Sequence, residues 1–329
     1  MMQAYSMRLC LQRASMITLA ALMLTAVRFR FACAADPSKP EYLYVWSGAQ
    51  NASLARDSLF VFCADPGPDF GKLLNIIETP YNGLEPHHCR SSVDGRWLAC
   101  SALLAALSGL PTILFFDLTN PAKPVLLHNA TMPPNSAFAD EFAATPDGGF
   151  VVTMMGDKNG RAPGRVARYD ANLNLMGEFP KNVSTIPQAN SFNPHGIAAD
   201  FNHNTMMTVD YLEPESTLVG FNLTARNTAR LWNLRDLSII TTYTLPKSVR
   251  AKGAMDAVAT GRGGYFFTGG NGYVFYLDPT DPKERKRSGP AVRAVRAPRS
   301  VPLSYTFTAL AIGDAVAIAR VRQYGFNMP

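Results

Sequence analysis

Five short apolar runs constrain the fold of this chain more than any other feature of its sequence. Each run leads into Asp, Asn or a turn, and successive runs are roughly 45 to 60 residues apart, the period of a four-stranded propeller blade with variable loops. A β-sandwich would explain the strands but not the repeat. The sequence therefore predicts an all-β protein, a β-propeller with about five blades, in which the runs occupy corresponding positions: 59–62, 113–117, 166–170, 229–233 and 273–278.

The first 34 residues have the layout of a secretory signal peptide. Arg8 and Arg13 precede an uncharged apolar run over 16–27, and small residues at 32–34 favour cleavage after Ala34. The run has about 12 residues, well below the roughly 20 that a bilayer span requires, so no permanent membrane span is expected. The sequence thus predicts a protein of the secretory-pathway lumen or a secreted glycoprotein, with sequons at Asn51, Asn129, Asn182 and Asn222.

The positive charge of the chain is concentrated near its C-terminus. The formal net charge is +6, and a run from Lys283 to Arg299 with seven Lys or Arg against Glu284 accounts for it. No aromatic residue interrupts this run to stack on bases, so it is interpreted as a solvated segment and no nucleic-acid partner is expected. The predicted organisation is a signal peptide over 1–34, a propeller over 35–281, and a basic linker and tail over 282–329. Two apolar runs in this tail, 307–312 and 315–318, are expected to form one hairpin.

Two of the five histidines are adjacent, at His87 and His88, in a segment bounded by Glu85 and Cys89. Neighbouring side chains on a regular strand point to opposite faces, so a paired His-His can hold one metal ion only from a loop or a strand end. Pro86 and the turn-forming residues before it favour that placement. The alternative is a surface loop whose imidazoles only form hydrogen bonds.

Removal of the leader would leave three cysteines, Cys63, Cys89 and Cys100. An odd number allows at most one intrachain disulfide, and Cys89 and Cys100 are close enough in sequence to pair across a hairpin in an oxidising compartment. Cys89 is alternatively a soft metal ligand beside His88, of the kind that Cu(I) accepts. The sequence leaves both alternatives open.

Several segments resemble the selenium-binding protein family, which includes the methanethiol oxidases. These segments are, in chain order, 41–46, 87–88, 155–157 with 164–170, 193–197, 206–211 and 253–256. The resemblance extends from about Glu41 to Asp278 and implies a fold similar to a seven-bladed propeller. It also implies copper as the cofactor and a small thiol as the substrate, with oxidation of methanethiol by oxygen to formaldehyde, hydrogen sulfide and hydrogen peroxide.

The same resemblance implies which residues hold the metal. His87 and His88 match the family's paired histidines, and His195 matches the histidine of a Pro-His-Gly segment, where a turn would hold the imidazole at the inner end of a blade. The three are expected to share one ion, with ligating nitrogens within roughly 4 Å of one another. The alternative for His195 is a histidine that caps a turn. His128 and His203 are expected to be structural.

The sequence departs from the family's pattern in three places. Arg90-Ser91-Ser92 replaces a Cys-rich segment, which argues against selenium binding and leaves Cys89 as the only nearby thiol. Ala139-Asp140-Glu141 stands where many relatives carry another histidine, so a ligand is missing or exchanged for a carboxylate. The match ends after about five blades, so we expect an open or imperfectly closed ring. Its open blade face, beside 273–277, would promote self-association unless residues 307–318 cover it.

Three functions are compatible with these features. The first is an exported, copper-dependent methanethiol oxidase. The second is a non-catalytic, degenerate propeller that acts as a secreted binding protein, which the incomplete ligand set favours. The third is a propeller hydrolase such as a lactonase, for which Asp140, Glu141 and Asp210 are too scattered in sequence to predict an acidic calcium site. Weak or absent thiol oxidation is expected from this chain alone.

Overall fold

The computed structural model describes residues 41–49, 51, 53, 55–245, 253–269, 273–279, 293–296, 305–312 and 315–322. These residues form a nearly all-β structure, and its helices are four short 3-10 or π segments: η1 (Leu103–Ser108), η2 (Val183–Thr185), η3 (Ala189–Ser191) and η4 (Glu215–Val219). Within these ranges no helix has both the length and the hydrophobicity needed to cross a membrane. The predicted signal peptide lies outside the described residues.

The chain divides into two compact units, residues 1–45 with 59–76 and residues 46–58 with 77–329. Most of a three-stranded sheet belongs to the first unit. Its strands are β1 (Tyr42–Ser47), β2 (Ser58–Cys63) and β3 (Leu73–Glu78), in that order. The middle strand is the most buried of the three, and Leu59 and Val61 have no exposed surface.

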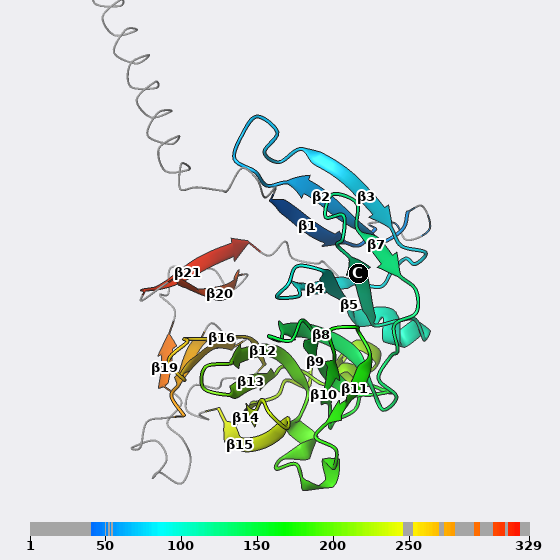
Figure 1. Cartoon of the computed structure of the whole chain (residues 1–329). Helices are drawn as coiled ribbons and strands as arrows, with labels where there is room; N and C mark the ends of the chain where they lie inside the picture. The colour runs from blue at the N-terminus through cyan, green and yellow to red at the C-terminus, as the bar shows by residue number, and fades with distance from the viewer. Residues whose placement is uncertain are drawn as a thin grey trace, which may run out of the picture. The chain divides into compact units, whose positions relative to one another are not determined.

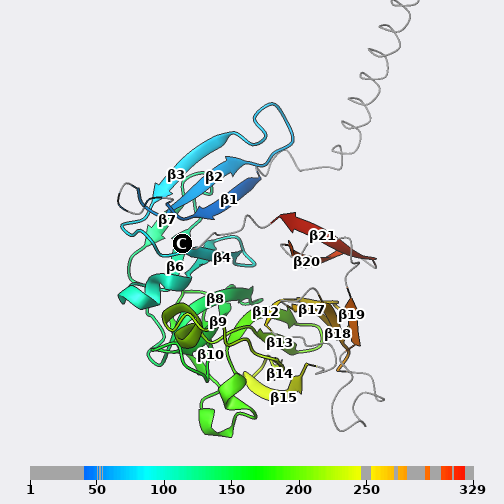
Figure 2. The same ribbon diagram turned by 180° about the vertical axis from the view of Figure 1, so that it is seen from behind.

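The second unit contains four four-stranded antiparallel meanders that follow one another along the chain (Figure 1 and Figure 2). Strands are adjacent in sequence order within each meander. The first two consist of β4 (Pro86–Ser91), β5 (Trp97–Ala102), β6 (Ile113–Asp117) and β7 (Val125–Leu127), and of β8 (Ser136–Ala144), β9 (Phe150–Asp157), β10 (Arg165–Tyr169) and β11 (Leu175–Phe179). The other two consist of β12 (Pro194–Asp200), β13 (Thr205–Asp210), β14 (Thr228–Asn233) and β15 (Ser238–Thr244), and of β16 (Ala254–Ala259), β17 (Tyr265–Gly269), β18 (Tyr273–Leu277) and β19 (Arg293–Arg296).

Four of the five apolar runs of the sequence occupy corresponding strands, as predicted. They form the third strand of a meander, namely β6, β10, β14 and β18, whereas the first run forms β2, the middle strand of the three-stranded sheet. A third strand has a partner on each side, and neighbouring sheets cover its faces, so nearly all of its residues are apolar. In β6, for example, every residue from Ile113 to Phe116 is buried.

Apolar side chains fill the spaces between consecutive meanders. One buried cluster joins the first meander to the second, where the rings of Phe115 and Tyr169 meet edge to face with centroids 5.2 Å apart. A second cluster, around Trp232, joins the second meander to the third, and another joins the third to the fourth. The first strands also lie next to one another, β4 by β8, β8 by β12 and β12 by β16. This serial packing of sheets is propeller-like.

The fold continues past residue 281, where the sequence predicted the propeller domain to end. The fourth strand of the last meander, β19, comes from the segment interpreted as a basic linker and pairs antiparallel with β18. Backbone hydrogen bonds make this pairing, so the basic composition of the segment does not prevent it. The predicted hairpin is confirmed: β20 (Tyr305–Ile312) and β21 (Ala315–Arg322) pair antiparallel, and β20 lies near β16 and β17.

Candidate metal centre

A β-bulge recurs in the first strand of every four-stranded meander. The register with the second strand shifts between Pro86 and Cys89 in β4, Ala139 and Phe142 in β8, Pro194 and Ile197 in β12, and Ala254 and Ala257 in β16. The residue pairs inside these bulges are His87-His88, Asp140-Glu141, His195-Gly196 and Met255-Asp256. A bulge breaks the strict alternation of side chains between the two faces of a sheet. Adjacent residues such as His87 and His88 can therefore face the same site.

Hydroxyl groups on the second strands fix three of these four bulges. The backbone N–H groups of His88, Glu141 and Asp256 donate to Ser101 Oγ (2.9 Å), Thr153 Oγ1 (2.9 Å) and Thr268 Oγ1 (3.2 Å), respectively. Thr153 also donates its hydroxyl proton to the carbonyl oxygen of His195 at 2.6 Å, which ties the second meander to the third. The backbone that carries the site is thus held by buried and partly buried hydrogen bonds.

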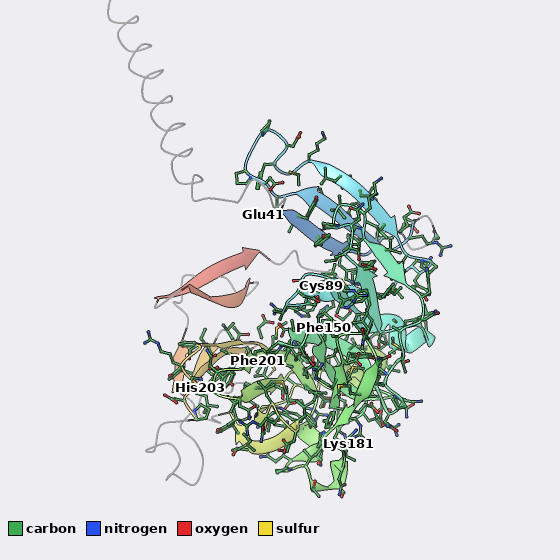
Figure 3. The ribbon with its side chains drawn as sticks, viewed as in Figure 1. Glu41, Cys89, Phe150, Lys181, Phe201 and His203 are labelled. Carbon is green, nitrogen blue, oxygen red and sulfur yellow. A yellow bond between two sulfur atoms is a disulfide. The ribbon has the colours of Figure 1, made fainter. Side chains whose placement is uncertain are left out.

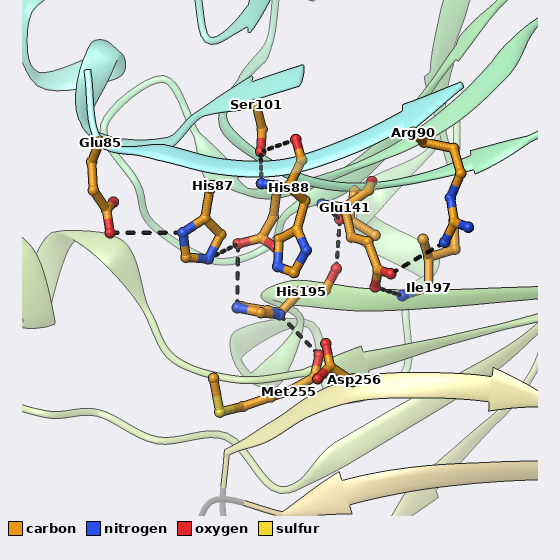
Figure 4. Close-up of polar contacts among 12 residues, drawn as sticks. Glu85, His87, His88, Arg90, Ser101, Glu141, His195, Ile197, Met255 and Asp256 are labelled. Carbon is orange, nitrogen blue, oxygen red and sulfur yellow. Dashed lines mark hydrogen bonds and ion pairs between the residues drawn. The ribbon is translucent and has the colours of Figure 1, made fainter. Parts of the chain in front are cut away.

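The side chains of His87, His88, Asp140 and His195 converge on one point (Figure 4). One nitrogen or oxygen atom of each lies within 4.8 Å of the corresponding atoms of the other three. Asp140 Oδ1 is 3.3 Å from His88 Nε2, and Asp140 Oδ2 is 3.3 Å from His195 Nε2 and 3.7 Å from His87 Nε2. The structure therefore brings together the three histidines that the sequence singled out, and it adds a carboxylate between them.

Burial keeps the imidazoles of this cluster neutral. It lowers the pKa of His88 to about 3 and the pKa of His195 well below its usual value, and it also lowers the pKa of His87. His195 Nδ1 lies 2.9 Å from the carbonyl oxygen of Met255, which can only accept, so Nδ1 carries the proton. The lone pair of His195 is then on Nε2, the atom that faces Asp140. Neutral imidazole with one nitrogen anchored in this way is the form that binds metals.

Asp140 is the least satisfied group of the cluster. Its side chain is fully buried, and neither carboxylate oxygen has a hydrogen-bond partner. Burial raises the pKa of Asp140 well above its usual value, and the nearby carboxyls of Asp256 and Glu85 raise it further. A buried carboxylate without a partner is costly, and a cation at the centre of the cluster would supply that partner.

The distances within the cluster fit a bound transition-metal ion. Ligand atoms about 2 Å from a tetrahedral ion are about 3.3 Å from one another. Asp140 already makes two separations of 3.3 Å, to His88 and to His195. Three imidazole nitrogens and one carboxylate oxygen are a donor set typical of zinc, copper or iron rather than of calcium, which takes oxygen ligands. The residues present therefore fit a transition metal.

Three further acidic side chains surround the cluster. Glu85 Oε1 is 3.7 Å from His87 Nδ1, and Glu141 accepts a 2.8 Å hydrogen bond from the backbone N–H of Ile197. Burial raises the pKa of Glu141 to about 8 and also raises the pKa values of Glu85 and Asp256. These groups are thus disposed to hold protons next to the site.

An aromatic ring borders the cluster on the side of His195. The ring of Tyr211 contacts His195 edge to face, with centroids 5.0 Å apart. Gly253 has a positive φ of 66°, and a Cβ atom at this position would lie 3.0 Å from the Tyr211 ring. The glycine therefore allows the backbone to approach Tyr211 closely, which positions the ring beside the site.

The structure decides between the two alternatives for Cys89. Cys89 and Cys100 are direct partners in the β4–β5 register and form a disulfide. The sulfur of Cys89 is therefore not available as a soft metal ligand or as a selenium acceptor, and the interpretation of Cys89 as a free thiol is wrong. The cross-link instead ties β4 to β5 at the residue after His88. Cys63 is the free cysteine among the described residues.

The other residues singled out from the sequence lie away from the cluster. His128 is exposed, and exposed His203 contacts Asp200 through Nδ1 at 3.0 Å, as expected for structural histidines. Figure 3 shows His203 well apart from Cys89, the neighbour of the paired histidines. The asparagines of all four sequons are exposed: Asn51, Asn129, Asn182 and Asn222.

From the sequence, segment 139–141 was expected either to lack a ligand or to carry a carboxylate in its place, but the central position of Asp140 and the neighbouring positions of Asp256 and Tyr211 were not predicted. A signal for Asp140 was present, because Asp140 and His87 each precede the apolar run of their own meander by 26 residues. Alignment of the repeats on these runs would have placed the two residues at equivalent positions. Asp256 and Tyr211 follow loops of different length, and no fixed spacing marks them.

Comparisons with known proteins support the fold. No family model matches the sequence, and no curated protein matches it. The structure is similar to that of a hypothetical selenium-binding protein from Sulfolobus tokodaii, with a TM-score of 0.58 and 14% sequence identity over 79% of this chain and 60% of that one. It is also similar to a putative 6-phosphogluconolactonase from Bacteroides uniformis, with a TM-score of 0.55 and 13% identity over 85% of this chain and 74% of that one.

These similarities concern architecture alone. At 13–14% identity they show a shared fold, and this chain spans less than two thirds of the selenium-binding structure. The chain is therefore a nearly all-β protein with propeller-like sheets and a fold-level similarity to a selenium-binding protein.

Proposed function

We propose that this chain is a propeller of the selenium-binding protein type that binds one transition-metal ion through His87, His88 and His195. The observation that carries the proposal is the convergence of three neutral imidazoles, from β4 and β12, on a buried carboxylate that lacks any other partner. A cluster of this kind is costly to build unless a cation completes it. Copper is the proposed ion, as the resemblance to the methanethiol oxidases implies.

The proposed activity is the oxidation of a small thiol, in which methanethiol, oxygen and water give formaldehyde, hydrogen sulfide and hydrogen peroxide. Bound copper would supply the electron-transfer chemistry between thiol and oxygen. The carboxyl groups of Glu85, Glu141 and Asp256 lie around the cluster, and their raised pKa values suit them to hold a proton there and to pass it on. The anchored Nδ1 of His195 keeps its Nε2 directed at the centre. Slow turnover is expected, because Asp140 stands where many relatives carry a nitrogen ligand.

The cluster argues against the lactonase alternative that the second structural neighbour suggests. A calcium-dependent hydrolase would need a site rich in oxygen ligands. Asp210, one of the three acidic residues considered for such a site, is instead paired with buried Arg230. The centre of the described second unit offers three imidazoles with Asp140, a set suited to a transition metal.

A secreted binding protein without catalytic activity is the second candidate. The observation that favours it is the disulfide at Cys89, which removes the only thiol next to the site. Both candidates include export after removal of a signal peptide, glycosylation, and self-association through an open blade face. Light scattering of the purified protein tests the self-association. A strictly monomeric protein would show that the proposed self-association is wrong.

Release of hydrogen peroxide from methanethiol tests the activity. Copper-loaded wild-type protein is expected to release peroxide slowly, and His195→Ala, loaded in the same way, is expected to release none. His203→Ala is a matched control, because His203 lies outside the cluster. Peroxide formation that is absent from the wild type, or equal in wild type and His195→Ala, would eliminate the oxidase and leave the binding protein.

A further inference from the structure

Asp140 contacts every other member of the cluster. Its two oxygens lie 3.3 to 3.7 Å from the Nε2 atoms of all three histidines. None of these contacts satisfies the carboxylate by a hydrogen bond, and its side chain has no exposed surface. Geometrically, Asp140 is as central to the cluster as any of the histidines.

No lysine or arginine pairs with Asp140 within the described residues. The side-chain nitrogens within 4 Å of its oxygens are those of the three imidazoles, which are members of the cluster themselves. The guanidinium of Arg90, on the same strand as His87 and His88, instead faces Glu141 at 3.7 Å. The carboxyl of Glu85 lies beside His87 and that of Glu141 beside Ile197, so neither supplies a positive charge. An external cation is thus the partner that this carboxylate lacks.

The charge and the hardness of the donor determine which cation fits. At a given distance, the attraction of a carboxylate for a divalent ion is twice its attraction for a monovalent ion. Carboxylate oxygen is a hard donor, whereas Cu(I) is selected by soft sulfur ligands. No sulfur atom is among the four converging groups, and the sulfur of Cys89 is held in a disulfide. Both factors favour a divalent ion here.

We propose that Asp140 is a direct metal ligand and that it makes this site selective for divalent ions, Cu(II) or Zn(II), over Cu(I). The inference rests on the proposed metal binding at His87, His88 and His195. Asp140, which stands where many relatives carry a histidine, would thus determine which oxidation state of the metal the site prefers. With histidine in this place the four ligands would be neutral nitrogens, and the preference for the divalent state would weaken.

Metal affinities of Asp140 variants test the proposal. Dissociation constants for Cu(II), Zn(II) and, under anaerobic conditions, Cu(I) are measured by competition with chromophoric chelators. In Asp140→Asn, which keeps the shape of the side chain, the affinities for Cu(II) and Zn(II) are expected to fall about 100-fold or more, because even outer-shell changes cost 10- to 100-fold. In Asp140→His the affinity for Cu(I) is expected to rise relative to that for Cu(II). Asp94→Asn is the matched control, because it makes the same change at an exposed carboxyl that is not among the four converging groups.

The electron paramagnetic resonance spectrum of bound Cu(II) gives a second measurement. The wild type is expected to show coupling to three nitrogens, and Asp140→His to four. If the wild type binds Cu(II) tightly but both Asp140 variants keep the wild-type ratio of Cu(I) to Cu(II) affinity, the role of Asp140 is wrong and the proposed metal binding by the histidines still stands. Absence of any metal binding by folded wild-type protein would overturn the proposed function as well, so the two failures are distinguishable.

Discussion

Removal of the Cys89–Cys100 disulfide is expected to destabilise the fold by about 3 kcal/mol. The bond links residues 11 positions apart in sequence. Closing a loop of about 12 residues lowers the entropy of the unfolded chain by an amount worth about 3 kcal/mol at 25 °C. The β4–β5 pairing is made by backbone groups and does not itself depend on the bond. The effect is therefore expected to act mainly through the unfolded state.

Equilibrium unfolding in urea measures this loss. The double variant Cys89→Ser with Cys100→Ala is compared with the wild type, and Cys63→Ser serves as the matched control because Cys63 is the free cysteine of the described residues. With a slope of about 3 kcal/mol per molar urea, the midpoint should fall by about 1 M. The thermal midpoint should fall by roughly 6 to 12 °C. A double variant that unfolds at the wild-type midpoint would refute the reasoning.

Three further predictions follow from particular contacts. Arg230→Met is expected to cost about 3 to 5 kcal/mol in urea unfolding, because it leaves the buried carboxylate of Asp210 unpaired; a loss below about 1 kcal/mol would contradict this. The hydrogen bond from Asn174 lowers the pKa of Asp170. The ionised Asp170 carboxylate therefore stabilises the fold above about pH 4, and this stabilisation is lost as the pH falls through the lowered pKa. The urea midpoints of Asp170→Asn and wild type should therefore differ at pH 7 and approach each other as the pH falls below about 4, and a gap that stays constant over this range would exclude this contact as the cause. Native protein treated with an N-glycosidase should lose mass, and an unchanged mass would remove the prediction of glycans at the exposed sequons Asn51, Asn129, Asn182 and Asn222.

The third strands of the meanders were predictable from sequence because burial on both faces makes them continuously apolar. Runs such as 113–116 show this pattern without any knowledge of their neighbours. The first strands were not predictable in the same way. A strand such as β4 is short and half polar, and its bulge interrupts the alternation that sequence patterns detect.

The candidate site was only partly predictable, for chemical reasons. His87, His88 and His195 are prominent because histidine is rare in this chain. Asp140 is one of 25 acidic residues, and its residue type alone does not mark it; its place in the repeat and its burial do. β19 was missed because its arginines resemble a linker, although backbone pairing with β18 tolerates them. Local composition thus predicted the interior well and the irregular, polar positions poorly.

The metal content of the purified protein tests the central claim most directly. Elemental analysis is performed on wild-type protein and on the triple variant His87→Ala, His88→Ala and His195→Ala, after both have been shown to be folded by circular dichroism. About one transition-metal ion is expected per wild-type chain, as for a single four-ligand site, and none in the triple variant. A folded wild type without bound metal, or a triple variant that retains the wild-type metal content, would rule out a metal centre at these three histidines.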